Sequence, residues 1–239
     1  MRWLILALIM FLASCGITIT TSSTGAPVPA GDAPPSRLLP ATSVVGFADV
    51  VRAVQPVATQ ECRRRTQGVN CDFLVLVDPS RRAAPNAFQS VDKQGRPMLT
   101  FTAALINDVR NPDELAFILS HEAAHHIAGH IARQEQNAAA GAAVFADLAT
   151  LTGGDAADVA EAQKLGAAVG ARTYSKEFEL EADELGTIIT HRAGFNPLIG
   201  AQFFTVIPDP GDQFLGTHPP NTERLEAVRR TSARLGISE

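Results

Sequence analysis

Four of the six histidines lie within ten residues of one another, and this crowding constrains the 239-residue chain more than any other feature. They are His121, His125, His126 and His130. The segment opens with Asn111-Pro112-Asp113-Glu114, which supplies an N-cap side chain, a proline at the first helical position and two acids at the positive end of the helix dipole. Apolar residues then recur at spacings of three, four and seven. The sequence therefore predicts an amphipathic helix that runs to about Arg133.

His121 and His125 are four residues apart, so a helix places both imidazoles on one face, where they can bind one metal ion. Zinc accepts imidazole nitrogens at about 2.1 Å. Glu122 can take a proton from a metal-bound water and later deliver it to a leaving amine. His126 and His130 have the same spacing, but no acid follows His126. We expect this second pair to support the ligands from outside or to lie on the surface.

A third protein ligand must come from elsewhere in the chain. A metzincin site would use a glycine three residues and a histidine six residues beyond His125, but those positions hold Ala128 and Ile131. Gly129 and His130 are each displaced by one residue, which turns a helical side chain by about 100°.

Segment 176–184, KEFELEADE, has the densest group of carboxylates in the chain. Glu179 and Asp183 form a stripe on a predicted helix, and an aspartate in this position can accept the outer N–H of a metal-bound histidine. Glu179 is therefore the preferred third ligand. A solvated acidic face, or a ligand role for the neighbours Glu177 or Glu181, is the alternative.

Taken in order, these motifs resemble those of the gluzincin zinc metallopeptidases that include HtpX, the CAAX prenyl proteases and the periplasmic protease BepA. The similarity extends over residues 86–224. It rests on the strand motif Asn86-Ala87-Phe88, the HEAAH helix, His130, the E-x-x-x-D of Glu179 and Asp183, and the late motif of His218, Pro219 and Arg224. The resemblance implies one zinc ion held by His121, His125 and Glu179, with Asp183, His130 and Arg224 supporting these ligands.

The same resemblance places His218 over the metal. There it would donate to the oxyanion of the tetrahedral intermediate or occupy the fourth zinc position in a resting state, and an imidazole permits both. A loop histidine before two prolines is the structural alternative. A polypeptide substrate would lie extended along the sheet edge near Asn86, Ala87 and Phe88, adding a strand through its backbone.

The first fifteen residues, MRWLILALIMFLASC, place one positive charge before an apolar run too short to span a ~30 Å hydrocarbon core. This is typical of a signal peptide, and its end resembles a bacterial lipobox in which Cys15 would carry the lipid. An ordinary signal peptide with a chance cysteine is the alternative. Residues 16–43 are rich in Thr, Ser, Pro and Gly and predict a flexible linker before a domain of residues 44–239. Because Gly16, and not an aspartate, follows Cys15, the resemblance to Gram-negative lipoproteins implies sorting to the periplasmic face of the outer membrane.

Export would place Cys62 and Cys71 in an oxidising compartment, where a disulfide is the natural pairing. Metal binding by this pair is the weaker interpretation, because the two thiols lack nearby partner ligands. The formal net charge of −5 argues against a nucleic-acid partner, which would require a basic face.

The remaining pattern predicts an α+β fold, mainly helical, with a small three-stranded sheet. Strands are expected at 73–77, 86–91 and 98–102, with a hairpin turn at 92–95. The first helix, 44–65, should be kinked or interrupted at Pro56. The Ala- and Gly-rich region 136–172 should form two helices with a turn between them. Further helices are expected at 174–192, 197–204 and 221–235.

Together these features predict a zinc metalloendopeptidase that hydrolyses unfolded or misassembled cell-envelope proteins, with Glu122 as general base. One alternative is a non-proteolytic envelope assembly factor or holdase, whose zinc site is closed by His218. A second alternative is an interaction module in which the histidines occur by chance.

Overall fold

The structure, a computed structural model, describes residues 44–211, 216 and 218–238. The predicted signal peptide, the lipidation site Cys15 and the linker 16–43 lie outside the described residues. The elements are α1 (Val44–Arg65), β1 (Leu74–Asp78), β2 (Ala87–Val91), β3 (Pro97–Thr102), α2 (Ala103–Asp108), α3 (Pro112–Ile127), α4 (His130–Leu151), α5 (Ala156–Thr173), α6 (Ser175–Arg192), α7 (Pro197–Gly200), the 3-10 helix η1 (Ala201–Thr205) and α8 (Asn221–Arg234). The predicted α+β class, mainly helical with one small sheet, is confirmed.

The sheet has the strand order β1-β3-β2. β3 runs parallel to β1 and antiparallel to β2, with which it forms the predicted hairpin. Asp92 stabilises the hairpin turn, because its carboxylate accepts hydrogen bonds from the backbone N–H groups of Gln94 and Arg96. β2 is thus an edge strand among the described strands, and its outer backbone groups are available to another extended chain.

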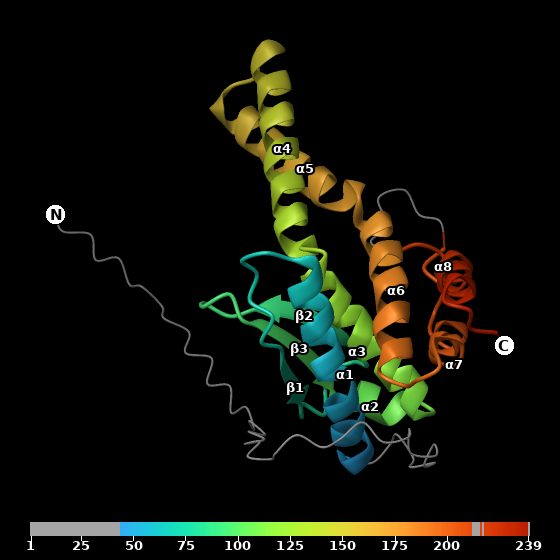
Figure 1. Cartoon of the computed structure of the whole chain (residues 1–239). Coiled ribbons are helices and arrows are strands. Elements are labelled where there is room, and N and C mark those ends of the chain that lie inside the picture. Colours follow the sequence, from blue (N-terminus) through green and yellow to red (C-terminus); the bar gives the residue numbers. More distant parts are fainter. Residues whose placement is uncertain (1–43, 212–215, 217, 239) are drawn as a thin grey trace.

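Helix α3 lies at the centre of the molecule, packed against α1, the sheet and α6 (Figure 1). Its residues 114–124 are all buried, which fixes the helix firmly in the core. The predicted N-terminal cap is confirmed, since the Asn111 side chain accepts a hydrogen bond of 2.9 Å from the backbone N–H of Glu114. The sequence thus anchors the start of the helix that carries the HEAAH motif.

The prediction that this helix continues to Arg133 is wrong. α3 ends at Ile127, and α4 begins at His130. Between them Gly129 adopts a left-handed conformation with φ of +68°, which glycine tolerates far better than other residues. The chain therefore changes direction at Gly129, four residues after the second histidine of the motif.

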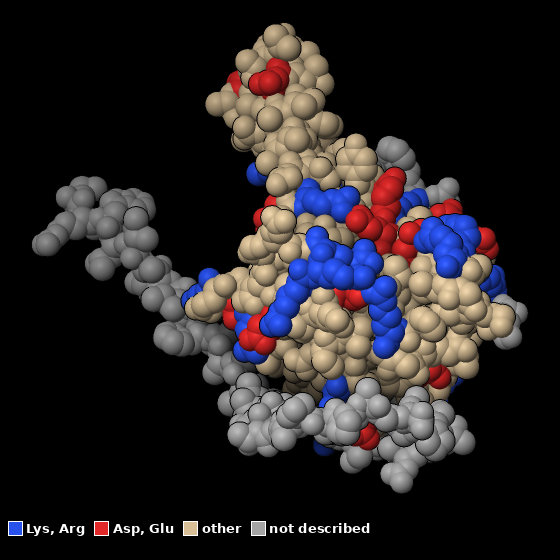
Figure 2. All heavy atoms as spheres, in the orientation of Figure 1, with Lys and Arg blue, Asp and Glu red and all other residues tan. Residues whose placement is uncertain are grey.

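Helices α4 and α5 form an antiparallel hairpin that projects from the body, and we call residues 130–173 the arm (Figure 1). Its two helices and intervening turn agree with the prediction for region 136–172. The helices approach closely because Gly141 faces Gly166 backbone to backbone, while Gly170 lies against Asn137. On the face that Figure 2 shows, uncharged residues cover most of the arm, and acidic residues gather near its tip. Among the described residues, no helix combines the length and apolarity that a membrane span requires.

The structure differs from the sequence predictions at two further elements, the helices α1 and α2. Helix α1 continues through Pro56 without interruption, since this proline lies on its exposed face while Val54 and Ala58 pack into the core. Helix α2 was not predicted, because its six residues follow β3 directly. Its cap is Thr102, whose hydroxyl accepts a hydrogen bond from the N–H of Leu105.

Candidate metal centre and active site

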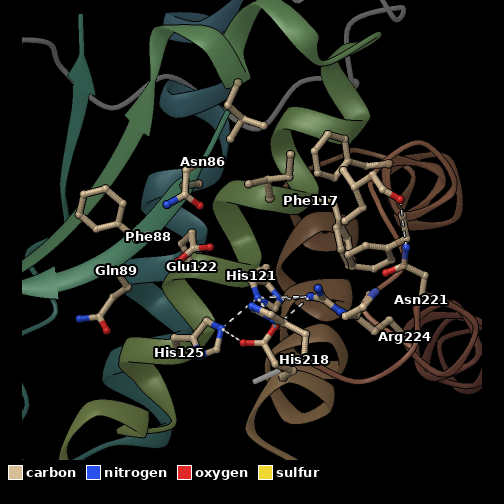
Figure 3. Close-up of a pocket in the computed structure, with 18 of the residues that line it drawn as sticks. Asn86, Phe88, Gln89, Phe117, His121, Glu122, His125, His218, Asn221 and Arg224 are labelled. Atoms are coloured by element: carbon tan, nitrogen blue, oxygen red, sulfur yellow. Dashed lines mark hydrogen bonds and ion pairs between the residues drawn. The ribbon is translucent and has the colours of Figure 1, made fainter. Parts of the chain in front are cut away.

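His121 and His125 lie next to each other on α3 (Figure 3). Together with Glu179 on α6 they bring three ligand atoms to one point, all within 4.8 Å of one another. The two Nε2 atoms are 2.9 Å apart, and each lies 3.4 to 3.5 Å from a carboxylate oxygen of Glu179. Ligands around a tetrahedral zinc ion are separated by about 3.4 Å. Two imidazoles and one carboxylate at these separations fit a zinc ion that keeps a fourth position open.

Asp183, one turn beyond Glu179, is completely buried and lies 2.9 Å from Nδ1 of His121. Its two oxygens also accept hydrogen bonds of 2.8 Å from Arg224 on α8. Burial acts to lower the pKa of His121, but its hydrogen bonds to Asp183 and Glu179 outweigh burial and raise the pKa to about 10. The pocket around this imidazole therefore favours positive charge, as a cation site should.

His130 lies directly behind His125, with the two Nδ1 atoms 2.8 Å apart. The change of direction at Gly129 produces this contact. Residues five apart on a continuous helix would point about 140° away from each other. The His130 ring is buried and stacks on Phe178 at a centroid distance of 4.6 Å. Burial and the neighbouring His125 lower the pKa of His130 to about 4, so its ring is neutral near pH 7.

Glu122 is buried and faces a cavity of about 930 Å³ that also exposes the three ligands. The edge strand, through Phe88 and Gln89, and Asn86 directly before it form one wall of this cavity (Figure 3). The carboxylate of Glu122 thus lies between the ligand cluster and the strand at which an extended peptide could pair. The Asn86-Ala87-Phe88 segment predicted for the substrate strand borders the same cavity.

The opposite wall of the cavity is apolar, and sequence reasoning missed it. It includes Phe117, Phe203, Phe204 and Ile207. The Arg224 guanidinium lies 4.0 Å from the centre of the Phe204 ring, so this wall is joined to the polar network behind His121. For Phe203, Phe204 and Ile207 the signal in the sequence was an apolar cluster after Pro197, which has the same appearance as an ordinary core segment.

His218 reaches the cavity from the loop before α8, and its Nδ1 lies 3.2 Å from Oε2 of Glu179 (Figure 3). Its side chain is half exposed. The ring thus lies at the edge of the ligand cluster, a position compatible with both roles that the resemblance implied. Of the alternative carboxylates, Glu177 is exposed to solvent, and Glu181 pairs with Arg133 and His130 instead of joining the ligands.

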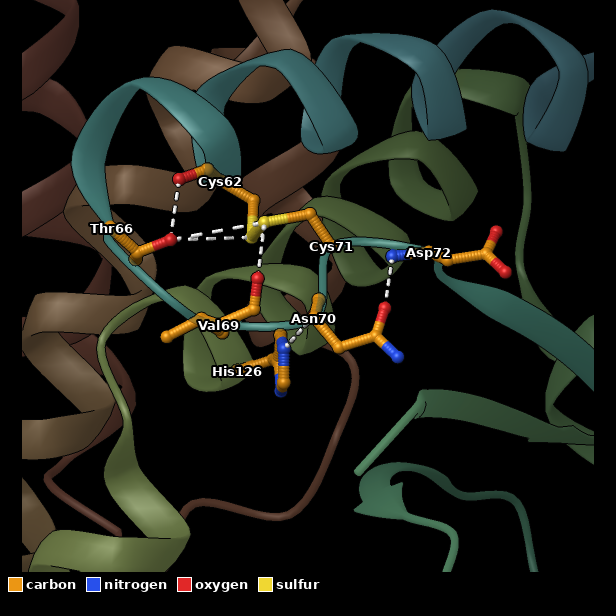
Figure 4. The surroundings of a disulfide bond; sticks show 7 residues. All are labelled: Cys62, Thr66, Val69, Asn70, Cys71, Asp72 and His126. Atoms are coloured by element: carbon orange, nitrogen blue, oxygen red, sulfur yellow. Dashed lines mark hydrogen bonds between the residues drawn. A yellow bond between two sulfur atoms is a disulfide. The ribbon is translucent and has the colours of Figure 1, made fainter. Parts of the chain in front are cut away.

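His126 points away from the ligand cluster. Its Nε2 lies 2.7 Å from the carbonyl oxygen of Asn70, in the loop that the Cys62–Cys71 disulfide closes (Figure 4). This disulfide links the end of α1 to the segment before β1, and closing a loop of this length stabilises a fold by about 2.7 kcal/mol in the chain-entropy model. His126 therefore connects the metal helix to the disulfide loop.

The fold and the site define a mainly helical metalloprotein. Its metal-ligand cluster consists of the two histidines of an HExxH helix and a glutamate from a second helix. The family model for peptidase family M48 matches residues 48–232, well over half of the sequence. The chain therefore belongs to peptidase family M48, which confirms the family resemblance inferred from the motifs.

Two relatives match parts of the chain. The mitochondrial metalloendopeptidase OMA1 of Saccharomyces cerevisiae is 29% identical over 173 residues, which cover 68% of this chain and 47% of that protein. The metalloprotease YcaL of Escherichia coli is 29% identical over 128 residues, which cover 51% of this chain and 50% of that protein. The chain spans about half the length of each of these relatives.

Proposed function

We propose that this protein is a zinc-dependent metalloendopeptidase that cleaves unfolded or misassembled proteins of the cell envelope. The observation that carries the proposal is the convergence of His121, His125 and Glu179 beside Glu122, at a cavity bordered by an edge strand. Membership of family M48 and the similarity to the metalloendopeptidase OMA1 and the metalloprotease YcaL support the same chemistry.

Zinc in this cluster would polarise the peptide carbonyl and lower the pKa of water to about 7. Glu122, placed between the cluster and β2, accepts the proton of the attacking water and returns it to the leaving amine. His218, whose Nδ1 lies 3.2 Å from Oε2 of Glu179, donates to the oxygen that gains negative charge. Arg224 and Asp183 keep His121 oriented throughout.

The substrate binds as an extended segment that pairs with β2 and places apolar side chains against the wall of Phe117 and Ile207. Only unfolded or locally opened proteins supply such segments. A lipid on Cys15 would hold the enzyme at the periplasmic face of the outer membrane, with residues 16–43 as the tether. This location rests on the sequence pattern of the first 43 residues.

A second candidate function is supported by the 3.2 Å contact between His218 and Glu179. If His218 occupies the fourth zinc position, the site is closed, and the protein acts as a non-proteolytic assembly factor or holdase.

Cleavage of casein and of an unfolded outer-membrane protein separates these candidates, with zinc occupancy measured in the same samples. We expect cleavage by the wild type and a loss of about 10²- to 10⁴-fold in Glu122→Gln at unchanged zinc content. Glu184→Gln is the matched control, because Glu184 lies on α6 outside the cavity and pairs with Arg234. Cleavage only after His218→Ala indicates a closed site. If the wild type and His218→Ala are both inert at full occupancy, the peptidase function is wrong.

A further inference from the structure

Within the described part of the chain, no carboxylate contacts Nδ1 of His125 in the way that Asp183 contacts Nδ1 of His121. Its Nδ1 faces Nδ1 of His130, and the other ring nitrogen of His130, Nε2, lies 3.2 Å from Oε2 of Glu181. Arg133 holds the same Glu181 oxygen at 2.6 Å. A continuous chain of contacts thus leads from His125 to a carboxylate at the surface.

With the His130 ring neutral, these contacts allow one arrangement of protons. An ionised carboxylate can only accept, so Nε2 of His130 must carry the N–H that points at Glu181. A neutral imidazole has a single N–H, which leaves Nδ1 of His130 as an acceptor. Nδ1 of His125 must then be the donor across the 2.8 Å contact. The remaining nitrogen of His125, Nε2, keeps its lone pair free on the side that faces His121 and Glu179.

We propose that Glu181 and His130 are positioning residues, with Glu181 acting through His130 to fix the tautomer and ring orientation of His125 for metal binding. Arg133 holds Glu181 in place. Three residues of α6 then act at the metal site. Glu179 is a ligand, Asp183 orients His121 directly, and Glu181 orients His125 through the ring of His130. The inference rests on the proposed zinc site.

The solvent exposure of Glu181 and Arg133 distinguishes a role in positioning the metal ligand from a role in stabilising the fold. The side chains of Glu181 and Arg133 are 48% and 44% exposed, and ion pairs with this exposure contribute little to stability. Loss of Glu181 should therefore leave the unfolding of the metal-free protein nearly unchanged. A hydrogen-bond partner of a ligand histidine, in contrast, typically changes metal affinity by about 10- to 100-fold.

The test measures the zinc dissociation constant of the full chain by competition with a chromophoric chelator, together with the melting temperature of the zinc-free protein. We expect Glu181→Ala to weaken zinc binding about 10-fold without changing that melting temperature. Glu181→Gln should restore most of the affinity, since its amide oxygen still accepts from His130. The matched control is Glu184→Ala, which removes another partly exposed, ion-paired glutamate of α6 and should leave zinc affinity at the wild-type value.

His130→Phe tests the intervening ring, since phenylalanine keeps the stacking on Phe178 but cannot accept from His125. We expect its zinc affinity to fall about 10- to 100-fold, and Glu181→Ala should cause no further loss in this background. Equal affinities for Glu181→Ala and Glu184→Ala, or additive effects in the double variant, would overturn the proposal. So would a wild type that binds no zinc. A wild type that binds zinc but does not cleave overturns the peptidase function and leaves this inference standing.

Discussion

Nδ1 of His121 lies 2.9 Å from Oδ1 of Asp183, a carboxylate that is completely buried and comes from a different helix. The same carboxylate accepts two hydrogen bonds from Arg224, whose side chain is also buried. Helices α3, α6 and α8 thus meet at one charged network directly behind the ligand cluster. This network couples the stability of the fold to the geometry of the metal site.

Replacing Asp183 by asparagine should cost about 3 to 5 kcal/mol in the free energy of unfolding, because it leaves the buried Arg224 with too little negative charge. Urea unfolding of the zinc-free protein measures this cost. Adding Arg224→Met to Asp183→Asn should recover part of the loss by removing the uncompensated cation. If Arg224→Met lowers the free energy of unfolding of Asp183→Asn by as much as it lowers that of the wild type, the two side chains act independently and the network is not coupled.

Metal binding should release a proton from His121. In the metal-free protein, burial opposes the charge on this ring, but Asp183 and Glu179 raise its pKa to about 10, above the ordinary 6.5. The protonated ring therefore stabilises the fold fully below about pH 6.5, and this contribution is lost as the pH rises through 10. We expect the chelator-treated protein to lose stability over that interval. Calorimetric zinc titrations at about pH 7.5 in buffers of different ionisation enthalpy should show release of about one proton. Buffer-independent heats would contradict this expectation.

The arm depends on the close contact of its two helices. A Cβ atom added at Gly166 would overlap the backbone carbonyl oxygen of Gly141. We therefore expect Gly166→Ala to destabilise the protein by about 1 to 3 kcal/mol and to increase protease nicking within residues 130–173. Ala160→Ser, at an exposed position of the same helix, is the control and should stay within about 0.5 kcal/mol of the wild type. Equal stability of the two variants would show that the helices can separate without cost.

Local signals were strong enough to predict the metal helix from sequence. The cap at Asn111, the apolar spacing of α3 and the HEAAH motif all operate within a few residues, and each is present in the structure. The choice of Glu179 among its acidic neighbours required long-range information, because the sequence does not show how α6 faces α3. Packing decides it: Glu179 is buried toward the histidines, whereas Glu177 is exposed.

The family resemblance predicted that His130 supports the ligands, but the residue spacing did not predict its direct contact with His125. The apolar periodicity predicted a helix that continues through Gly129. In such a helix His130 would point away from His125. Gly129 indicated a possible helix end, since glycine is the residue that most readily adopts a positive φ. A glycine inside a helical pattern is often tolerated, however, so this signal did not decide the boundary. A single backbone conformation at Gly129 therefore decides whether His130 belongs to the site.

The proposed function requires that His121, His125 and Glu179 together bind one zinc ion. The most direct test is a crystal structure of the zinc-loaded protein, with anomalous data collected on both sides of the zinc absorption edge. We expect one strong anomalous peak about 2.1 Å from Nε2 of each histidine and from a carboxylate oxygen of Glu179. Absence of such a peak at full zinc loading, or a peak whose ligands exclude Glu179, would contradict the account.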